Sequence, residues 1–269
     1  MDLIEYTKAL GAAVTAWKGT DLLKEIYGDA LKPGVAQVGK ALDGVLGLGN
    51  TALYPIHLLN GRARAALESN LERYRERLAN EPIEKIAEVP AEVGVPIAEK
   101  LAYVSDPSLA ELYVELLAKA SLVEDMGLAH PSFVNLINAL SPDEAAFLRT
   151  WAAASSALLV LPLFGKPTEA VQKIIGEALY EPRTSEGLAF PQNLDAYISN
   201  LAGLGVLQTT FDKQRILPGA YDALEAQVKT QYAHIVAPDE QITFKRGLAE
   251  VTPYGRMFLQ ACGVRPRTP

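Results

Sequence analysis

The stretch that decides the fold is residues 106–151, DPSLAELYVELLAKASLVEDMGLAHPSFVNLINALSPDEAAFLRTW. Proline stands at the predicted first helical position of three helices in this stretch, at Pro107, Pro131 and Pro142. A proline is tolerated there because its missing N–H would have had no partner within the helix. Apolar residues recur at helical spacing after each proline. The stretch therefore predicts three successive helices.

The residues before these prolines are suited to cap the helices. Asp106 and Ser141 precede two of them as N-caps, and His130 precedes the third as a weaker cap. Glu144 follows Ser141 at the spacing of a capping box, in which the glutamate carboxylate accepts a hydrogen bond from the cap N–H. The middle helix, which carries Phe133, is apolar over most of its circumference, so we expect it to be central.

The same region resembles the bacterial Abi-alpha family, which is named for abortive infection. The likeness is strongest over residues 84–148 and extends over about 20–263. Its signature is a four-residue motif ahead of the apolar helix and a second motif after it: His130, Pro131, Ser132 and Phe133, then Ser141, Pro142 and Glu144. The resemblance implies a role in defence against phage and brings no catalytic residues with it. We therefore interpret the signature residues as structural.

Composition favours a mostly α protein of two units. The 269 residues are 49% hydrophobic, which is enough to bury a core, and only 7% aromatic. We place a boundary near residue 140. The predicted architecture is an N-terminal multi-helix domain (1–140) and a C-terminal winged-helix-like α+β domain (141–269) with a small β wing.

Charge and cysteine content limit the setting of the protein. The net charge of −7 argues against a polyanionic partner for the chain as a whole. Cys262 is the only cysteine, so the chain cannot form an internal disulfide and suits a reducing compartment. The first residues, with Asp2 and Glu5, lack the basic region of a signal peptide. We expect a cytoplasmic protein.

Two segments of the N-terminal half contrast in character. Residues 35–59 form an apolar, glycine-rich run that is too short and too interrupted to span a membrane. We leave two interpretations open for this run, a buried hairpin or contact with a membrane surface. Residues 61–78 instead alternate in charge around a narrow apolar seam and predict an exposed helix. Further on, Pro96 is predicted to open another helix.

The C-terminal half predicts helices with two strand candidates. The helix that begins at Pro142 is expected to reach Leu158, with a connector at 161–167 and another helix at 168–180. Later elements are a helix from Asn193 to about Gly205, a strand at 206–211, a helix at 221–235, strand pieces at 242–245 and 248–251 hinged at Gly247, and a last helix capped by Thr252.

This order resembles a winged helix-turn-helix domain with a helix inserted in the wing. The predicted reading helix, Asn193 to Gly203, carries Asp195 as its sole formal charge. Residues 141–269 hold twelve Lys and Arg against thirteen Asp and Glu, which leaves a net charge of −1. DNA-binding domains are usually basic. Lys245 and Arg246, at the predicted wing tip, are the candidate nucleic-acid contacts.

Sites for chemistry are weakly indicated. The three histidines and Cys262 are scattered singly, so no metal-ligand spacing occurs and we predict no metal or cofactor. Cys262 is expected to be a buried, inert thiol. The adjacent carboxylates Glu111 and Glu115 are interpreted as part of an exposed polar face.

Two functions from different classes remain. The first is a non-enzymatic defence protein whose helical N-terminal half binds a protein partner, a second copy of itself or a membrane surface. We place this contact at residues 35–59 and on the charged helix 61–78. The second is a winged-helix transcriptional regulator that binds DNA through Lys245 and Arg246.

Overall fold

The computed structural model describes residues 33–47, 61–152, 156–165, 173–174, 176, 178–181, 187–237 and 240–264. The described chain is mostly helical and carries one small antiparallel sheet towards its C-terminal end. It divides into two compact units. The first comprises Met1–Pro142 together with Gln260–Gly263, and the second comprises Asp143–Leu259 and Val264–Pro269.

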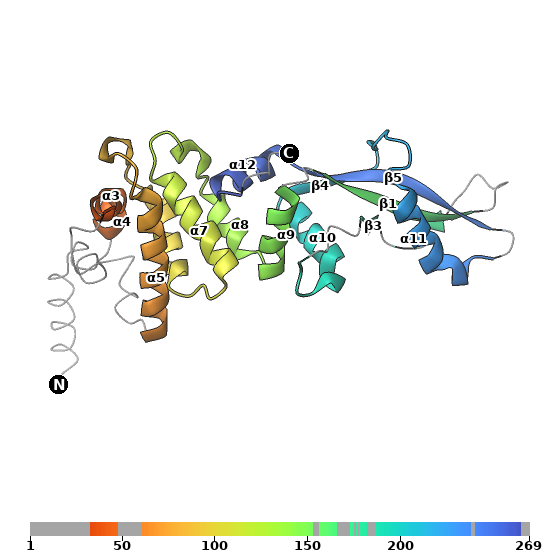
Figure 1. Cartoon of the computed structure of the whole chain (residues 1–269), viewed down its shortest axis with the longest axis horizontal. Coiled ribbons are helices and arrows are strands. Elements are labelled where there is room, and N and C mark those ends of the chain that lie inside the picture. Colours follow the sequence, from red (N-terminus) through yellow and green to blue (C-terminus); the bar gives the residue numbers. More distant parts are fainter. Residues whose placement is uncertain are drawn as a thin grey trace, which may run out of the picture. The chain divides into compact units, whose positions relative to one another are not determined.

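The first unit is helical (Figure 1). Its helices are α3 (Val35–Ala41), α4 (Asp43–Gly47), α5 (Gly61–Leu78), α6 (Ala91–Leu101), α7 (Pro107–Ala120) and α8 (Ser132–Asn138), with 3-10 turns at Ile83–Lys85 and Met126–Leu128. Helix α7 is the centre of this unit because α5, α6 and α8 all pack against it. Its start is the predicted one: Pro107 is the first helical residue, and the Asp106 carboxylate accepts from the N–H groups of Ser108 and Leu109.

Helix α5 confirms the predicted seam. The four apolar residues at 4-3-4 spacing are all buried, namely Leu67, Leu71, Tyr74 and Leu78. Two polar groups share the seam. Asn70 Nδ2 donates to the Leu101 carbonyl at 2.8 Å, and the Tyr74 hydroxyl lies 2.6 Å from Ser121 Oγ, which itself donates to the Leu117 carbonyl. These bonds satisfy buried polar groups at the ends of α6 and α7.

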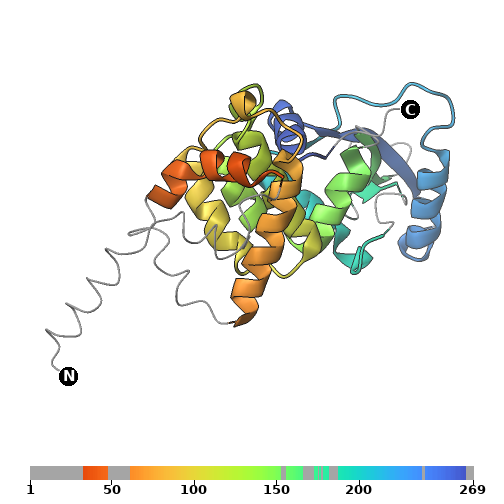
Figure 2. The ribbon, with the colours of Figure 1, turned by 60° about the vertical axis from the view of Figure 1, so that its left-hand side comes forward.

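Helices α3 and α4 form the described half of the apolar run at 35–59. Val38, Ala41, Leu42 and Val45 are buried, and α3 packs on α5 (Figure 2). A Cβ at Gly94 of α6 would lie 2.4 Å from Val45 Cγ2, so the approach of α4 to α6 requires glycine there. Residues 48–59 of the run lie outside the described chain. Among the described helices, none is long and apolar enough to cross a bilayer.

The prediction that Pro96 opens a helix is wrong. Helix α6 begins at Ala91, after Pro90, and Pro96 lies inside it. Pro96 has no N–H to donate to the Glu92 carbonyl four residues earlier, so α6 lacks one intrahelical bond at this place. The apolar residues assigned to this helix, Ile97 and Leu101, are buried as expected.

The second unit combines helices with the sheet. Its elements are α9 (Pro142–Ala152), β1 (Ser156–Gly165), β2 (Lys173–Ile174), β3 (Leu179–Tyr180), a 3-10 turn at Pro191–Asn193, α10 (Leu194–Gly203), β4 (Leu207–Thr210), α11 (Asp222–Tyr232), a 3-10 turn at Ala233–Ile235, β5 (Gln241–Val251) and α12 (Pro253–Ala261). The sheet is antiparallel with the strand order β2-β1-β5-β4, and β3 also pairs with β1.

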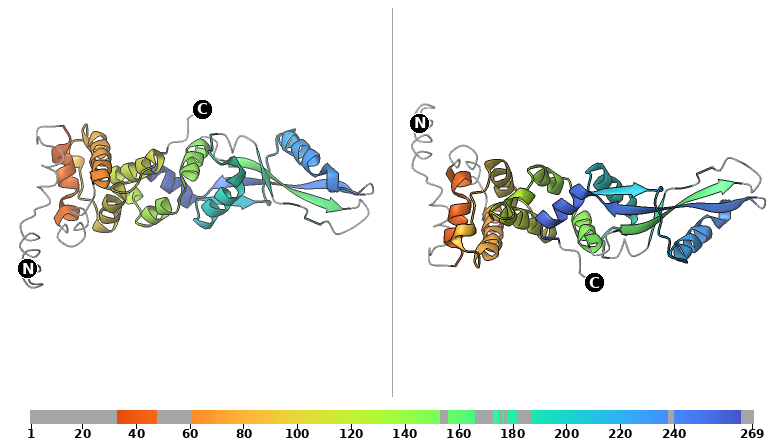
Figure 3. Two further views of the ribbon diagram at one scale, coloured as in Figure 1. Left: turned by 90° about the horizontal axis from the view of Figure 1, so that it is seen from below. Right: turned by 90° about the horizontal axis from the view of Figure 1, so that it is seen from above.

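Strands β1 and β5 form a long ribbon. They pair over ten residues, from Ser156 opposite Glu250 to Gly165 opposite Gln241 (Figure 3). Helix α11 packs on one face of this ribbon. The buried cluster on that face consists of Val160, Tyr221, Leu224 and Val228, with Ile242, Phe244 and Leu248 half-buried around it.

Three predictions are wrong in the region of strands β1, β2 and β3. The helix expected to reach Leu158 ends at Ala152, the expected connector at 161–167 is strand through Gly165, and residues 173–174 and 179–180 of the expected helix at 168–180 are strands. Leu159 and Val160 point to opposite faces and both are buried. A strand buried on both faces is a continuous apolar run, which periodicity cannot separate from a buried helix.

The remaining elements of this unit are close to their predictions. Helix α10, β4, α11 and α12 lie where expected, and Gly205 has the positive φ of 75° that suits a residue after a helix end. The two predicted strand pieces are one uninterrupted strand, β5, so Gly247 is not a hinge. A Cβ on Gly247 would lie 2.4 Å from the Thr210 carbonyl oxygen, which explains the glycine by close approach.

The closing helix returns the chain to the first unit. Thr252 Oγ1 accepts from the Gly255 N–H at 2.9 Å, which is the predicted cap, and Gly263 with φ 66° follows the helix end. Residues Gln260–Gly263 belong to the first unit, where Cys262 is buried. Burial first, and then the charge of Glu115, raises the pKa of the Cys262 thiol well above its usual range. The thiol is therefore protonated and inert.

Candidate functional site

The loop between β4 and α11, residues 211–220, carries the most exposed large apolar side chain of the described chain. The Ile216 side chain is 92% exposed and the adjacent Leu217 is 67% exposed. A single exposed aliphatic residue is ordinary on a protein surface. Ile216 and Leu217 are neighbours in one loop and are followed by Pro218 and Gly219. Together they form a small exposed apolar patch, and exposing apolar surface to water is unfavourable. We name this segment the β4–α11 loop.

Both ends of the β4–α11 loop are fixed. At its start, the Asp212 N–H donates to Thr210 Oγ1 at 3.1 Å. At its end, the buried Tyr221 hydroxyl donates to the Gly247 carbonyl at 2.9 Å and accepts from the Arg215 N–H at 3.0 Å. A loop held in this way loses little conformational entropy when it binds a partner. Its anchoring therefore suits it for contact.

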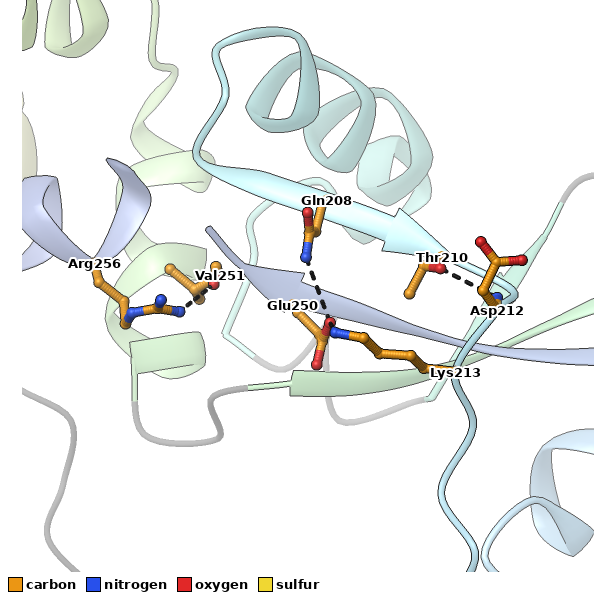
Figure 4. A network of polar contacts seen from close by, with 7 residues as sticks. All are labelled: Gln208, Thr210, Asp212, Lys213, Glu250, Val251 and Arg256. Carbon is orange, nitrogen blue, oxygen red and sulfur yellow. Dashed lines mark hydrogen bonds and ion pairs between the residues drawn. The ribbon is translucent and has the colours of Figure 1, made fainter. Parts of the chain in front are cut away.

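Polar contacts turn the loop back towards the start of β4. Lys213 Nζ lies 3.0 Å from Glu250 Oε2, and Gln208 Nε2 of β4 lies 3.5 Å from the same oxygen (Figure 4). Arg215 Nη2 lies 3.3 Å from Ser156 Oγ, which stands opposite Glu250 in the ribbon. The loop therefore crosses the sheet face on which Ser156 and Glu250 lie. Arg256 also bonds to the Val251 carbonyl in this region (Figure 4).

Lys245 and Arg246 do not lie at a wing tip, contrary to the prediction. Both are within β5, opposite Leu161 and Val160 of β1. Lys245 Nζ lies 5.4 Å from the centre of the Phe211 ring, and Arg246 lies 5.3 Å over the Tyr221 ring. They are misplaced because the wing was predicted from two short strands with a turn at Gly247, whereas one strand runs through both.

Arg246 also forms an ion pair with α11. Its Nε donates to Glu225 Oε1 at 2.6 Å, and this bond is the main reason that the pKa of Arg246 is raised. The cation is thus engaged by a carboxylate and an aromatic ring of the same unit. DNA contact by Lys245 and Arg246 remains a prediction. It requires these side chains to exchange their present partners for phosphate.

Helix α10 offers a weakly charged outer surface. The exposed residues of its first two turns are Asp195, Ala196 and Ser199. Asp195 is the sole formal charge of the helix. A reading helix normally presents Arg, Lys, Asn or Gln to base edges, and Asn200 Nδ2 here donates to Glu144 Oε1 at 2.7 Å. Helix α10 therefore lacks the basic side chains that a DNA-reading helix usually carries.

A buried carboxylate, that of Asp143, connects α9 to α10 by hydrogen bonds. Asp143, at the start of α9, is 7% exposed and accepts hydrogen bonds from the N–H groups of Ala189 and Phe190, both at 2.8 Å, and from the Tyr197 hydroxyl at 2.9 Å. Burial alone would raise the pKa of Asp143. The three hydrogen bonds outweigh that effect, so its pKa lies below the ordinary value of 3.8. Asp143 is ionised and acts as a structural anchor.

The signature residues lie at the starts of α8 and α9. His130 Nδ1 accepts from the Ser132 N–H at 3.2 Å and lies 2.7 Å from Ser132 Oγ, and its ring lies 5.7 Å from that of the buried Phe133. Pro131 directly precedes α8 and already has helical φ and ψ. The contacts of His130 are those of a cap. Nothing around it in the described chain forms a cluster of acids.

Ser141, Pro142 and Glu144 form the second half of the signature. Pro142 is the first residue of α9, as predicted. Glu144 is buried near the start of α9, and its carboxylate accepts a hydrogen bond from the Asn200 side chain. This bond connects α9 to α10. The capping box between Ser141 and Glu144 stays a prediction. The sequence pattern did not reveal the partner on α10, because the two residues are 56 positions apart.

The carboxylates Glu111 and Glu115 of α7 are not merely an exposed face. Arg77 of α5 contacts both, through Nη2 to Glu111 and Nε to Glu115. These contacts, the hydrogen bond to Glu115 first, raise the pKa of Arg77 against the opposing effect of burial. The two carboxylates therefore hold the Arg77 guanidinium between them, and we name this group the Arg77 clamp. Within the described chain there is no group of three or more His, Cys, Asp or Glu residues that could hold a metal ion.

The profile of a family described as abortive infection alpha matches residues 66–262. The chain belongs to the abortive infection alpha family. The match includes α7, α8 and α9 with the signature residues, and it extends over the whole sheet. The family's description indicates a defence role of the abortive-infection type. No curated protein matches the chain. No solved structure matches it either.

Sequence reasoning missed the β4–α11 loop. The sequence pattern predicts a strand at 206–211 and a helix that begins at Tyr221, and it gives no prediction for the residues between them. The available signal was an apolar pair, Ile216 and Leu217, placed in a segment that otherwise contains Asp212, Gly219 and other turn formers.

Proposed function

We propose that this protein is a bacterial defence protein that acts by binding another protein through the β4–α11 loop, without catalysis. The observation that carries the proposal is the exposed pair Ile216 and Leu217 on a loop fixed at both ends. Family membership supplies the biological context.

The chemistry of the loop defines the partner. Ile216 and Leu217 would enter an apolar groove, while Lys213 and Arg215 beside them suit an acidic rim. Apolar anchors bordered by charge are typical of protein interfaces. We place this contact in the bacterial cytoplasm, where the single buried cysteine stays reduced.

Phage challenge of a bacterial host that expresses the protein tests the proposal. We expect wild-type protein to lower plaque formation by some phage of a broad panel, and the double variant Ile216→Asp with Leu217→Asp to lose that effect. The matched control is Val123→Asp, which changes an exposed aliphatic residue of the first unit. Unchanged plaquing across the panel contradicts the defence role. Full protection by the loop variant contradicts the contact site.

The absence of catalysis has its own test. The variant His130→Asn keeps a side chain that caps helices well and removes the imidazole that would act as an acid or base. We expect protection to be retained. Loss of protection in a variant that folds normally would show that the imidazole takes part in chemistry.

The alternative is a winged-helix regulator that binds DNA. It is favoured by one observation, the succession of α10, β4 and β5 with β5 paired between β1 and β4. The inserted helix α11 and the engaged side chains of Lys245 and Arg246 speak against it. Replacing both by Glu should weaken DNA binding and reduce its salt dependence. If the wild type retards no duplex at low salt, the alternative is excluded.

A membrane surface is the third partner to test. Three apolar side chains of α3 and α4, and Leu42 between these helices, are buried, which favours the core interpretation for residues 35–47. The interpretation of 48–59 rests on sequence alone. Flotation with anionic liposomes distinguishes the two, because a protein without membrane affinity stays at the bottom of the gradient.

A further inference from the structure

Strand β5 is paired along only part of one edge. Strand β1 covers its other edge from Gln241 to Glu250, whereas β4 pairs only with residues 248–251. Figure 3 shows β4, in cyan, ending part-way along β5. In the described chain, residues 241–246 therefore have a strand partner on one side only. An open edge is a template on which another strand can form.

The alternation of the ladder identifies the free groups. The Thr252 N–H donates to the Val206 carbonyl, so even-numbered residues of β5 direct their N–H and C=O groups towards β4. The register is constant from Gln241 to Val251, without a bulge. Ile242, Phe244 and Arg246 consequently direct their backbone groups away from β1, to the open edge.

The β4–α11 loop does not close this edge. After Thr210 the chain turns at Asp212, and Lys213 reaches back to Glu250 (Figure 4). The loop thus leaves the edge at the level of Gly247 and crosses the sheet face. Among the described residues, none pairs with this edge of β5 from 241 to 246.

The open segment is complementary to itself. Its sequence from 240 to 246 is EQITFKR. When two copies pair antiparallel about Thr243, Ile242 stands opposite Phe244, and Glu240 stands opposite Arg246, whose Nε already donates to Glu225 of its own subunit. Opposite charges and aliphatic–aromatic pairs are the cross-strand pairs that stabilise antiparallel sheets. Each of these pairs occurs twice because the arrangement is two-fold symmetric.

Thr243 lies on the symmetry axis of this pairing. Its Oγ1 is buried and has no hydrogen-bond partner among the residues that the structure describes. In the paired state the two Thr243 residues form a non-hydrogen-bonded pair, the type in which opposite side chains lie closest. A rotation about χ1 would bring the two hydroxyl groups together, so that each buried oxygen gains a partner.

We propose that the protein self-associates by adding the β5 strand of a second copy, antiparallel and centred on Thr243, to form a continuous sheet across two subunits. This inference concerns a different surface from the β4–α11 loop and goes beyond the proposed function. It does not depend on the outcome of phage challenge.

Sedimentation equilibrium of the full chain from about 1 µM to about 1 mM covers the affinity range of specific dimers. We expect a monomer–dimer equilibrium. Ile242→Pro removes an N–H that points to the open edge and should abolish the dimer. Its matched control, Ile242→Ala, keeps that N–H and should weaken the dimer by about tenfold at most. A monomer throughout this range overturns the proposal, and so does a dimer that Ile242→Pro leaves unchanged.

Disulfide trapping tests the register. Thr243→Cys should cross-link on mild oxidation, because Cα atoms of a non-hydrogen-bonded pair are about 4.5 Å apart, within the reach of a disulfide. Gln241→Cys and Lys245→Cys should cross-link efficiently only when the two variants are mixed. Wild type is the control, since its single thiol is buried. Equal cross-linking of each variant alone contradicts the register. If the cysteine variants cross-link but the protein gives no protection against phage, only the proposed defence role is contradicted. If the protein protects but the variants do not cross-link, only the proposed dimer is contradicted.

Discussion

Helix α7 and strand β5 are the central elements of the two units, and they differ in how completely they are satisfied. Eight residues of α7 are buried, and its backbone bonds close within the helix and its cap. Strand β5 has the longest pairing in the sheet, yet about half of one edge is open. Within the described chain, the backbone groups of α7 have their partners, whereas residues 241–246 of β5 have a strand partner on one side only.

Both units contain polar side chains paired within the unit, such as Asp143 and Arg246 in the second, but the second unit also has polar contacts that hold an exposed apolar loop. Arg77 in the first unit holds Glu111 and Glu115 of the same unit, and Tyr74 holds Ser121. In the second unit, Tyr221 and Lys213 serve to present an apolar loop tip to solvent. We infer that the first unit is a scaffold and the second is the part that makes contact.

Amide hydrogen exchange should show the largest difference between α7 and the open edge of β5. At dilutions that keep the protein monomeric, the amides of Ile242 and Phe244 should exchange at least on the order of a thousandfold faster than that of Leu116, which opens only when the unit unfolds. Thr243, whose N–H points to β1, is the control within the same strand. Equal protection of Ile242 and Thr243 would show that the edge is covered.

Leu116→Ala tests the scaffold. Leu116 is fully buried in α7, and removing it should lower the free energy of unfolding by about 2–5 kcal/mol through lost burial and the cavity left behind. Urea denaturation followed by far-UV circular dichroism measures the change. A loss below about 1 kcal/mol would mean that α7 is not the centre of a packed core.

Asp143→Asn tests the anchor in the second unit. The variant should cost about 1–3 kcal/mol, since three donors lose an ionised acceptor. The folded-state pKa of Asp143 is depressed, so its contribution is present above about pH 3.8 and is lost as pH falls through the folded pKa. The gap between wild type and variant should therefore shrink below that pH. Asp212→Asn, at an exposed position, should show no such gap.

Arg77→Gln should have a smaller effect because the clamp is partly exposed. We expect a loss of about 1 kcal/mol that decreases with added salt, as screening weakens both contacts. Lys100→Gln on α6, also exposed, is the control. A loss independent of salt would indicate packing by the arginine stem instead of charge.

Ile216→Ser should have the smallest effect on stability. The side chain is almost fully exposed, so the free energy of unfolding should change by no more than about 0.5 kcal/mol. Thermal unfolding monitored at several wavelengths measures it. A marked destabilisation would place Ile216 in a core and remove the argument that the loop is free for a partner.

The helices around α7 were predictable because their signals are local. Asp106 and Pro107 fix a helix start within two residues, and the seam of α5 repeats every three or four positions. Strand β1 was not predictable in the same way. Ser156 pairs with Glu250, 94 positions along the chain, and only that pairing distinguishes the apolar run from a helix.

The candidate sites divide along the same line. The burial of Cys262 and the cap of α12 at Thr252 followed from neighbouring residues. The exposure of Ile216 and the open edge at Phe244 depend on where β4 ends and where the loop turns. Lys245 and Arg246 were misassigned for this reason, since a turn at Gly247 and a strand through Gly247 look alike in sequence.

The return of residues 260–263 to the first unit has a consequence for biosynthesis. The first unit lacks residues 260–263 until they have left the ribosome, so it cannot finish folding before residues 143–259 of the second unit have been translated. Neither half is therefore obtained intact by cutting the gene once. Protection of the Cys262 thiol from alkylation would mark the moment at which a nascent chain becomes complete.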